Sequence, residues 1–300
     1  MPPRTHYWIG ALLVFLAAFC FALKGVLIKL AYRYSIDAIS LLTLRMVFAL
    51  PFYLTIAAWL NRTQPPLRLR RRDWLWTALL GVTGYYVASF LNFLGLVYIT
   101  ASLERILLFV YPTFVLLLGV IFYQRRVSRL QLFALLLTYS GIVLAFLPHL
   151  QDDNQRSLFW GAFWVILSGL VYAVYLVGSD TMIAKTGPQR YTCYAMVAAT
   201  MPVVGHCAAA NGLDLLRFPA PVYGLALLMA VVVTVIPTFM ISEGIRRVGS
   251  GNASLIASIG PIFTIALSTS LLGEHISGHQ LAGTALVLLG VFLIGWRGKK

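Results

Sequence analysis

The sequence has few charged residues, and acidic residues are the scarcest of them. Only 11% of its 300 residues are Asp, Glu, Lys or Arg, and just nine are acidic. A soluble domain has nearer ~25% charged residues, so this chain has too little charge to cover a water-facing surface. By contrast, 60% of its residues are hydrophobic, and they form runs of about twenty, the length that spans a bilayer. The sequence therefore predicts an all-α membrane protein.

Cysteine is also scarce, and two common functional signatures are missing. Cys20, Cys193 and Cys207 all lie within apolar runs, which predicts small buried side chains. The segment Gly249-Ser250-Gly251 lacks the Lys-Ser/Thr pair of a phosphate-binding loop, which argues against an ATP-driven pump. The net charge of +14 comes from short loops rather than a folded basic domain, so nucleic acid is not an expected partner.

Hydropathy predicts ten transmembrane helices joined by short connections. They cover Trp8–Ala31, Ala38–Leu60, Leu75–Tyr98, Ser102–Tyr123, Leu130–Leu147, Leu158–Val177, Tyr191–Ala210, Val222–Ile241, Asn252–Leu272 and Gln280–Trp296. Sixteen Lys and Arg residues lie on the side of the N-terminus, three (Arg33, Arg156 and Arg217) on the other side, and four within helices. Because basic loops stay in the cytoplasm, we expect a multi-pass inner-membrane protein with both termini cytoplasmic and an even number of spans.

The two halves of the chain repeat each other. Shifts of 149 or 151 residues superimpose Gly95 on Gly244, Pro112 on Pro261, Gly10 on Gly161, and Pro51 on Pro202. Residues 8–147 and 158–296 are therefore predicted to form two five-helix repeats. Since five is an odd number, the second repeat enters the membrane inverted. Inverted repeats suit a carrier that works by alternating access.

Four prolines are predicted near helix centres, as two pairs related by the repeat: Pro51 with Pro202, and Pro112 with Pro261. A proline inside a helix removes one backbone hydrogen bond and kinks the helix. Such kinks are common structural features of membrane helices. Their occurrence in pairs favours the alternative that the prolines are hinges beside a midplane cavity.

Two segments resemble a known family motif. LLGEHISGHQLAGTALVLLGVFLIG, at 271–295, resembles the closing motif of an EamA domain in the drug/metabolite transporter superfamily. Residues 123–146 resemble the same motif with Gln124-Arg125 in place of its Gly-Glu pair. The resemblance implies that helices 1–4 and 6–9 line a central cavity, with helices 5 and 10 peripheral. It also implies transport of small metabolites, often outward, with a proton or an exchange substrate as coupling partner.

Five ionisable residues lie within the predicted helices, all in the first repeat: Lys24, Lys29, Arg45, Glu104 and Arg105. Charges at such depth usually face a cavity or a partner. Lys29 is close enough to the surface to reach the headgroups. One interpretation is that Glu104 pairs with Arg45 or Lys24 and joins the helices. The other is that the surplus positive charge binds the carboxylate or phosphate of a substrate, and both can hold.

The predicted substrate-binding set is Lys24, Arg45, Glu104, Arg105 and Tyr175, the last being the repeat counterpart of Lys24. Aromatic residues around Tyr175 suit stacking on a planar substrate or simple helix packing. His206 is predicted to be a hydrogen-bonded interior histidine rather than a proton relay. Glu274, His275 and His279 have the residue types of a metal site, but they occupy an outer loop, so we expect a solvated loop and no metal.

These patterns predict a secondary transporter that exports a small metabolite across the cytoplasmic membrane. Anionic, amino-acid-like and aromatic metabolites are the candidate classes. The alternative is an integral membrane enzyme acting on a lipid-soluble substrate, which would need a cluster of carboxylates or histidines at the membrane border. The only paired acids, Asp152-Asp153, have no second acidic motif. We therefore predict no catalytic residues and no cofactor.

Overall fold

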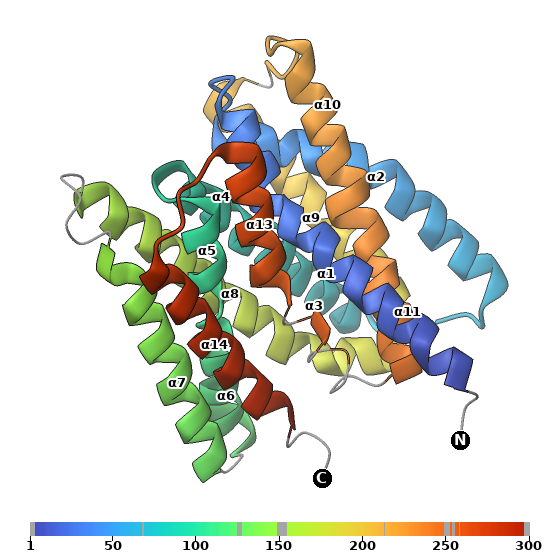
Figure 1. Cartoon of the computed structure of the whole chain (residues 1–300). Coiled ribbons are helices and arrows are strands. Elements are labelled where there is room, and N and C mark those ends of the chain that lie inside the picture. The colour runs from blue at the N-terminus through green and yellow to red at the C-terminus, as the bar shows by residue number, and fades with distance from the viewer. Residues whose placement is uncertain are drawn as a thin grey trace.

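The computed structural model describes residues 4–67, 69–124, 128–148, 155–212, 214–248, 253, 256–257 and 259–296. All regular structure in these ranges is helical (Figure 1). Three sites discussed above, Arg125, Asp152-Asp153 and Gly249-Ser250-Gly251, lie outside the described residues.

The helices fall into two series along the chain. The first series is α1 (Arg4–Tyr32), α2 (Ala38–Thr63), α3 (Arg71–Gly81), the π-helical η1 (Val82–Val87), α4 (Ala88–Tyr98), α5 (Ala101–Leu108), α6 (Tyr111–Tyr123) and α7 (Arg129–Phe146). The second series is α8 (Gln155–Thr186), α9 (Pro188–Asn211), α10 (Ala220–Leu228), the π-helical η3 (Met229–Val235), α11 (Ile236–Val248), α13 (Gly260–Leu272) and α14 (Gly278–Trp296).

Eight helices of the described chain are long and apolar enough to cross a membrane, and two shorter apolar helices, Gly260–Leu272 and Gly278–Leu293, follow them. The chain is thus a multi-pass membrane protein, and the count of ten spans stays a prediction. Some helices end later than hydropathy predicted, because polar residues continue the helix beyond its apolar part. α8 extends to Thr186, past the predicted end at Val177, because hydropathy detects only the apolar part of a helix.

Pro112 and Pro261 do not lie inside uninterrupted α-helices as expected, although Pro112 is near the middle of the candidate span Ala101–Phe122. Each stands in the first turn of a new helix, α6 or α13. A proline has no N–H to donate and its fixed φ suits a first helical turn, so it starts a helix more readily than it continues one. By contrast, Pro51 and Pro202 lie inside the continuous helices α2 and α9.

The packing of the helices follows a paired pattern. α1 packs against α11 and α13, and α8 packs against α4 and α6. α2 packs against α9, and α7 lies alongside α14 (Figure 1). Exchanging the two series of helices converts each of these contacts into another contact of the same set. η1 and η3 also correspond, because each interrupts the third helical unit of its series.

Glycines stand at two of the paired crossings. A β-carbon on Gly95 of α4 would lie 3.1 Å from the carbonyl oxygen of Gly161 in α8. A β-carbon on Gly244 of α11 would likewise lie 3.1 Å from the carbonyl oxygen of Gly10 in α1. The sequence repeat superimposes the same four residues. The glycines therefore allow the close helix approach that recurs in both halves.

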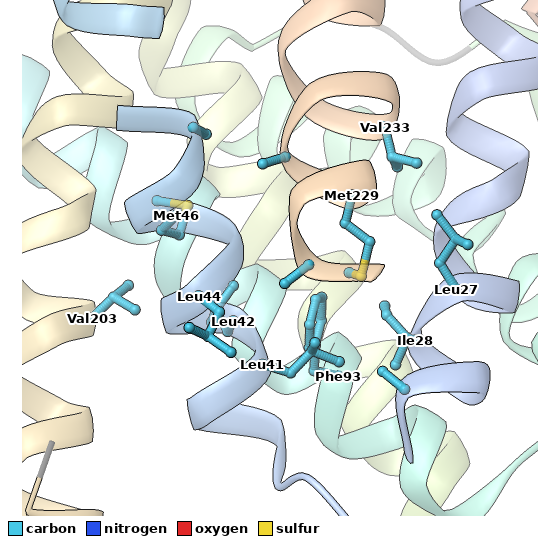
Figure 2. Close-up of a cluster of buried hydrophobic side chains, with 14 of the residues drawn as sticks. Leu27, Ile28, Leu41, Leu42, Leu44, Met46, Phe93, Val203, Met229 and Val233 are labelled. Carbon is cyan, nitrogen blue, oxygen red and sulfur yellow. The ribbon is translucent and has the colours of Figure 1, made fainter. Parts of the chain in front are cut away.

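The largest apolar cluster joins α1, α2, α4, α9 and η3 (Figure 2). It includes Leu27, Ile28, Leu41, Leu42, Leu44, Met46, Phe93, Val203, Met229 and Val233. Large apolar side chains are also exposed on the outside of the bundle, as at Leu136 (61%) and Phe159 (63%). An apolar exterior of this kind is suited to contact with lipid.

Most described basic residues outside the helix interiors gather at one end of the bundle, which we call the basic end. They are Arg62, Arg70, Arg71, Arg72, Arg129, Lys185, Arg190, Arg246 and Arg247. The opposite end carries Arg33, Arg156 and Arg217 together with Asp37, Asp214 and Glu274. α1 begins and α14 ends on the same side of the bundle (Figure 1).

Candidate functional site

Ionisable side chains from α1, α2 and α5 gather inside the bundle. Lys24 Nζ lies 3.5 Å from Glu104 Oε1. The same oxygen accepts a hydrogen bond of 2.6 Å from Asn92 Nδ2 of α4. Glu104 is 1% exposed and the Lys24 side chain 22%. The sequence predicted a pair between Glu104 and either Arg45 or Lys24, and the structure forms it with Lys24.

The short helix α5 positions the acidic and basic members of this cluster. Thr100 caps α5, because its hydroxyl accepts a hydrogen bond of 3.2 Å from Leu103 N. Glu104 follows within the first turn and faces Lys24 and Asn92. Arg105 is turned by ~100° around the helix axis, so it faces different neighbours.

Arg105 packs against α13 and the aromatic residues of α6 and α8. Its guanidinium lies so close to Gly260 that a β-carbon there would collide with it. The hydroxyls of Tyr111 and Tyr172 are near enough to interact with its charge. Among the described residues, Arg105 Nε is a buried nitrogen with no hydrogen-bond partner. A buried guanidinium of this kind retains donors for an incoming acceptor.

Arg45 of α2 is buried in the apolar core. It is 6% exposed, and its guanidinium carbon lies 5.2 Å from the centroid of the Phe93 ring, a cation–π arrangement. One terminal nitrogen contacts Met46 Sδ at 3.9 Å. Its Nε also has no hydrogen-bond partner within the described chain. Arg45 is therefore held by contacts that do not neutralise its charge.

Lys24 links the four groups electrostatically, and their charges do not balance. Lys24 lies within electrostatic reach of Glu104, Arg105 and Arg45. Three cations and one carboxylate give the cluster a formal net charge of +2. A surplus of buried positive charge is costly unless a counter-charge offsets it. The cluster is consequently suited to receive an anion.

A row of tyrosines extends from Arg105 towards α9. The ring centroids of Tyr111 and Tyr172 are 5.7 Å apart, and those of Tyr172 and Tyr175 are 5.6 Å apart. The Tyr175 hydroxyl donates a hydrogen bond of 2.8 Å to the Tyr85 hydroxyl, and its ring stacks with Tyr191 at 6.3 Å. Tyr175, predicted as a binding residue because it matches Lys24 in the repeat, thus contacts tyrosines rather than the charged groups.

His206 of α9 is hydrogen-bonded, as the sequence predicted. Its Nδ1 lies 2.7 Å from the Tyr86 hydroxyl, and Phe90 packs edge-on against its ring at 4.9 Å. The expected role as an interior hydrogen-bonding residue agrees with this geometry.

Glu274 is not a solvated loop residue, so that expectation was wrong. Its carboxylate accepts hydrogen bonds from Ala101 N (2.8 Å), Ser102 N (3.2 Å) and Ser102 Oγ (2.6 Å). An anion is favoured at this position because a helix N-terminus carries free N–H groups and a partial positive charge. His275 and His279 are exposed, and the described residues contain no group of three or more metal-type ligands.

The sequence did not predict that Asn92 and Tyr111 belong to the site. It also did not predict that Glu274 caps α5. Asn92 carried a usable signal, because a side-chain amide within an apolar run needs a hydrogen-bond partner. Tyr111 and Glu274 carried none that hydropathy detects. Their contacts depend on where the turn between α5 and α6 and the loop after α13 lie in space.

Known proteins match the chain over almost its whole length. A family model described as the EamA-like transporter family matches residues 8–147 and 159–296. "Uncharacterized transporter YcbK" of Bacillus subtilis is 33% identical over 95% of this chain and 91% of its own. "Uncharacterized inner membrane transporter YicL" of Salmonella typhimurium is 27% identical over 95% and 94%. A solved crystal structure at 13% identity aligns with a TM-score of 0.63 over 97% of this chain and 99% of that chain, which indicates a shared fold.

Proposed function

Because the chain belongs to the EamA-like transporter family, we propose that it is a secondary carrier that exports a small anionic metabolite across the cytoplasmic membrane. Transport of a small molecule through a membrane follows from the family. The anionic substrate is our inference from one observation: Lys24, deep in the bundle, lies within electrostatic reach of two further cations, Arg45 and Arg105, but of a single carboxylate, Glu104. A carboxylate or phosphate of the substrate would offset the remaining charge.

In this proposal Glu104 offsets part of the positive charge of the cluster while no substrate is bound. Its ion pair with Lys24 and the hydrogen bond from Asn92 keep the carboxylate in place. An entering anion would compete with Glu104 for the neighbouring cations. Binding would thereby loosen the contacts that join α1, α4 and α5, and loosening them is a step towards opening that side of the bundle.

The tyrosine row supports an aromatic or amino-acid-like substrate among the anionic candidates. Tyr111 and Tyr172 lie beside Arg105, so a molecule whose acidic group meets Arg105 would place its remaining atoms against aromatic rings. Tyrosine offers both a ring face for stacking and a hydroxyl for hydrogen bonding. An aromatic amino acid or aromatic carboxylate would use both.

We further propose ten spans arranged as two inverted five-helix repeats, with the basic end in the cytoplasm. The paired helix contacts, the matched glycine crossings and the matched π-helical segments support this arrangement. The excess of Lys and Arg at one end supports the orientation. Pro51, Pro112, Pro202 and Pro261 remain the proposed hinges, with Pro112 and Pro261 at the helix breaks.

Alternating access requires contacts that can break at one end at a time. At the basic end, Arg190 donates hydrogen bonds to the carbonyls of Leu60 (2.7 Å) and Pro65 (2.8 Å). At the opposite end, Glu274 accepts hydrogen bonds from the first turn of α5, including Ala101 N. Each set of hydrogen bonds joins a residue in 159–296 to residues in 8–147. We propose that the two sets open in turn.

Transport in liposomes tests the proposal. The purified protein is reconstituted and screened with labelled aromatic amino acids, aliphatic carboxylates, phosphate esters and neutral analogues, with and without a pH gradient. We expect an anionic compound to be transported, and Lys24→Ala to reduce that transport at least about tenfold, since 1.4 kcal/mol of lost binding is tenfold. Arg62→Gln, an exposed cation outside the cluster, should transport normally. Transport of neutral compounds only, or equal activity of Lys24→Ala, would contradict an anion site.

A further inference from the structure

A second polar site lies at the basic end, away from the charge cluster. A cavity of about 790 Å³ opens where α3 begins and α8 ends. Arg70, Arg72, Asp73, Trp76, Met182 and Lys185 contribute to its lining. A volume of this size is within the range of small-molecule pockets. Because α3 and α8 each begin or end a candidate span here, we expect the cavity to lie at the depth of the lipid headgroups.

The cations that line this cavity outnumber its single carboxylate, Asp73. Lys185 Nζ is paired with Asp73 Oδ1 at 2.5 Å, and Asp73 Oδ2 accepts a hydrogen bond of 3.0 Å from the backbone N–H of Arg70. The carboxylate is thus occupied by Lys185 and by the start of α3. Arg70 lies within electrostatic reach of Asp73, but no ion pair joins the side chain of Arg70 or Arg72 to any residue that the structure describes. Both are exposed.

The face of α3 beside the cavity is suited to lipid. Leu75 is 59% exposed, Trp76 45% and Leu79 49%. Leucines exposed on a membrane-spanning helix face hydrocarbon, and tryptophan prefers the boundary between hydrocarbon and water. The two guanidinium groups therefore lie directly above a lipid-facing surface, with Trp76 between the charged and apolar levels.

We propose that this cavity binds the phosphodiester headgroup of an anionic phospholipid from the leaflet at the basic end. Guanidinium groups donate paired hydrogen bonds to phosphate oxygens. Basic pockets between membrane helices on the cytoplasmic side attract anionic headgroups. The excess of Arg70, Arg72 and Lys185 over the single carboxylate of Asp73 favours a lipid with net negative charge over a zwitterionic lipid. The site is separate from the proposed substrate site and does not depend on it.

Lipid binding to the purified, delipidated protein tests the proposal. The protein in detergent is titrated with phosphatidylglycerol or phosphatidylcholine, and bound lipid is counted by native mass spectrometry. We expect the double variant Arg70→Gln/Arg72→Gln to bind phosphatidylglycerol on the order of tenfold more weakly, because each basic group near the membrane surface contributes to attraction of anionic lipid. Binding of phosphatidylcholine should be weak in the native protein and unchanged in the variant.

Matched control variants distinguish a specific lipid-binding site from nonspecific attraction by positive charge. Arg62→Gln/Arg71→Gln removes two exposed cations at the same end, neither of which lines the cavity, and should bind phosphatidylglycerol within about twofold of the native protein. Arg70→Lys/Arg72→Lys keeps the charge and should recover part of the affinity. An equal loss in the Arg62/Arg71 control, or equal binding of the two lipids by the native protein, would overturn the proposal. Tight binding of inorganic phosphate alone would assign the site to a soluble anion instead.

Discussion

At the scale of single residues, the cluster shows which part of a site the sequence can predict. Charges within apolar runs are visible in a sequence, and four of them, Lys24, Arg45, Glu104 and Arg105, interact in the structure. Which cation pairs with Glu104 depends on how α5 crosses α1, and composition does not encode that crossing. Repeat matching also has limits, because Tyr175 corresponds to Lys24 in sequence yet donates its hydrogen bond to Tyr85.

The Lys24–Glu104 pair leads to a prediction about stability. Removing one partner of a fully buried ion pair costs about 3–5 kcal/mol. Since the Lys24 side chain is 22% exposed, we expect Glu104→Gln to lower the stability of the protein in detergent by about 1–3 kcal/mol. The loss should be smaller in the double variant Lys24→Met/Glu104→Gln, because the unpaired charge is then absent.

Chemical unfolding of the two single variants and the double variant measures this coupling. An interaction energy above about 0.5 kcal/mol is expected for residues in contact. Lys29 lies in α1, like Lys24, but does not pair with Glu104. We therefore expect the effect of Lys29→Met to add to that of Glu104→Gln. Additive effects of Lys24→Met and Glu104→Gln would mean that the pair does not stabilise the fold.

At the scale of helices, hydropathy located the apolar segments and missed their interruptions. The two π-helical segments, η1 and η3, leave no hydropathy signal, since a π turn changes hydrogen-bond spacing and not composition. Pro112 and Pro261 were visible in the sequence, but whether a proline kinks one helix or starts another depends on the preceding turn. The matched glycines were the more reliable signal, because close helix approach needs a missing side chain.

The glycine crossings lead to a prediction about helix packing. In Gly95→Ala and Gly244→Ala the new methyl group would meet the facing helix, at Val165 in the first case and Val14 in the second. We expect each substitution to destabilise the protein by about 1–3 kcal/mol, the usual penalty for overpacking. Gly224→Ala is the matched control, because a β-carbon there has no neighbour within 4 Å.

Thermal unfolding in detergent distinguishes these outcomes. The Gly224→Ala variant should unfold at the native temperature or slightly above it, since alanine reduces the freedom of the unfolded chain. Similar losses in Gly95→Ala and Gly244→Ala would agree with equivalent crossings in the two halves. Native stability in both would show that the helices adjust easily and that the crossings are loose.

At the scale of the whole molecule, the repeat in the sequence corresponds to paired helix contacts in the structure. The two closing motifs differ, however, in the residues that they offer for contacts at the ends of the bundle. The Gly-Glu pair of the second closing motif supplies Glu274, which caps α5. The first closing motif has Gln124-Arg125 at the matching position. A neutral amide and a cation cannot supply the same capping anion. The first closing motif therefore does not encode the carboxylate that closes the opposite end.

Glu274 should accordingly control how often the opposite end opens. Glu274→Gln removes the negative charge that three donors of α5 contact, and hydrogen bonds to a charged group contribute about 1.5–3 kcal/mol. Losing even the lower figure raises the open fraction about tenfold. Ser268 is a suitable reporter, since it is fully buried and its hydroxyl lies 2.6 Å from Ser102 Oγ beside the cap.

Labelling with a membrane-impermeant maleimide from outside intact cells tests both this closure and the proposed orientation. In a protein freed of its three native cysteines, Ser268→Cys should react slowly, and about tenfold faster when combined with Glu274→Gln. Glu243→Gln, which removes a carboxylate at the basic end, should leave that rate unchanged.

Arg217→Cys should react readily from outside and Arg70→Cys should not, because the basic end is proposed to be cytoplasmic. Reaction of Arg70→Cys from outside would reverse the orientation. An unchanged Ser268→Cys rate alongside normal Arg217→Cys labelling would instead reduce Glu274 to a static helix cap.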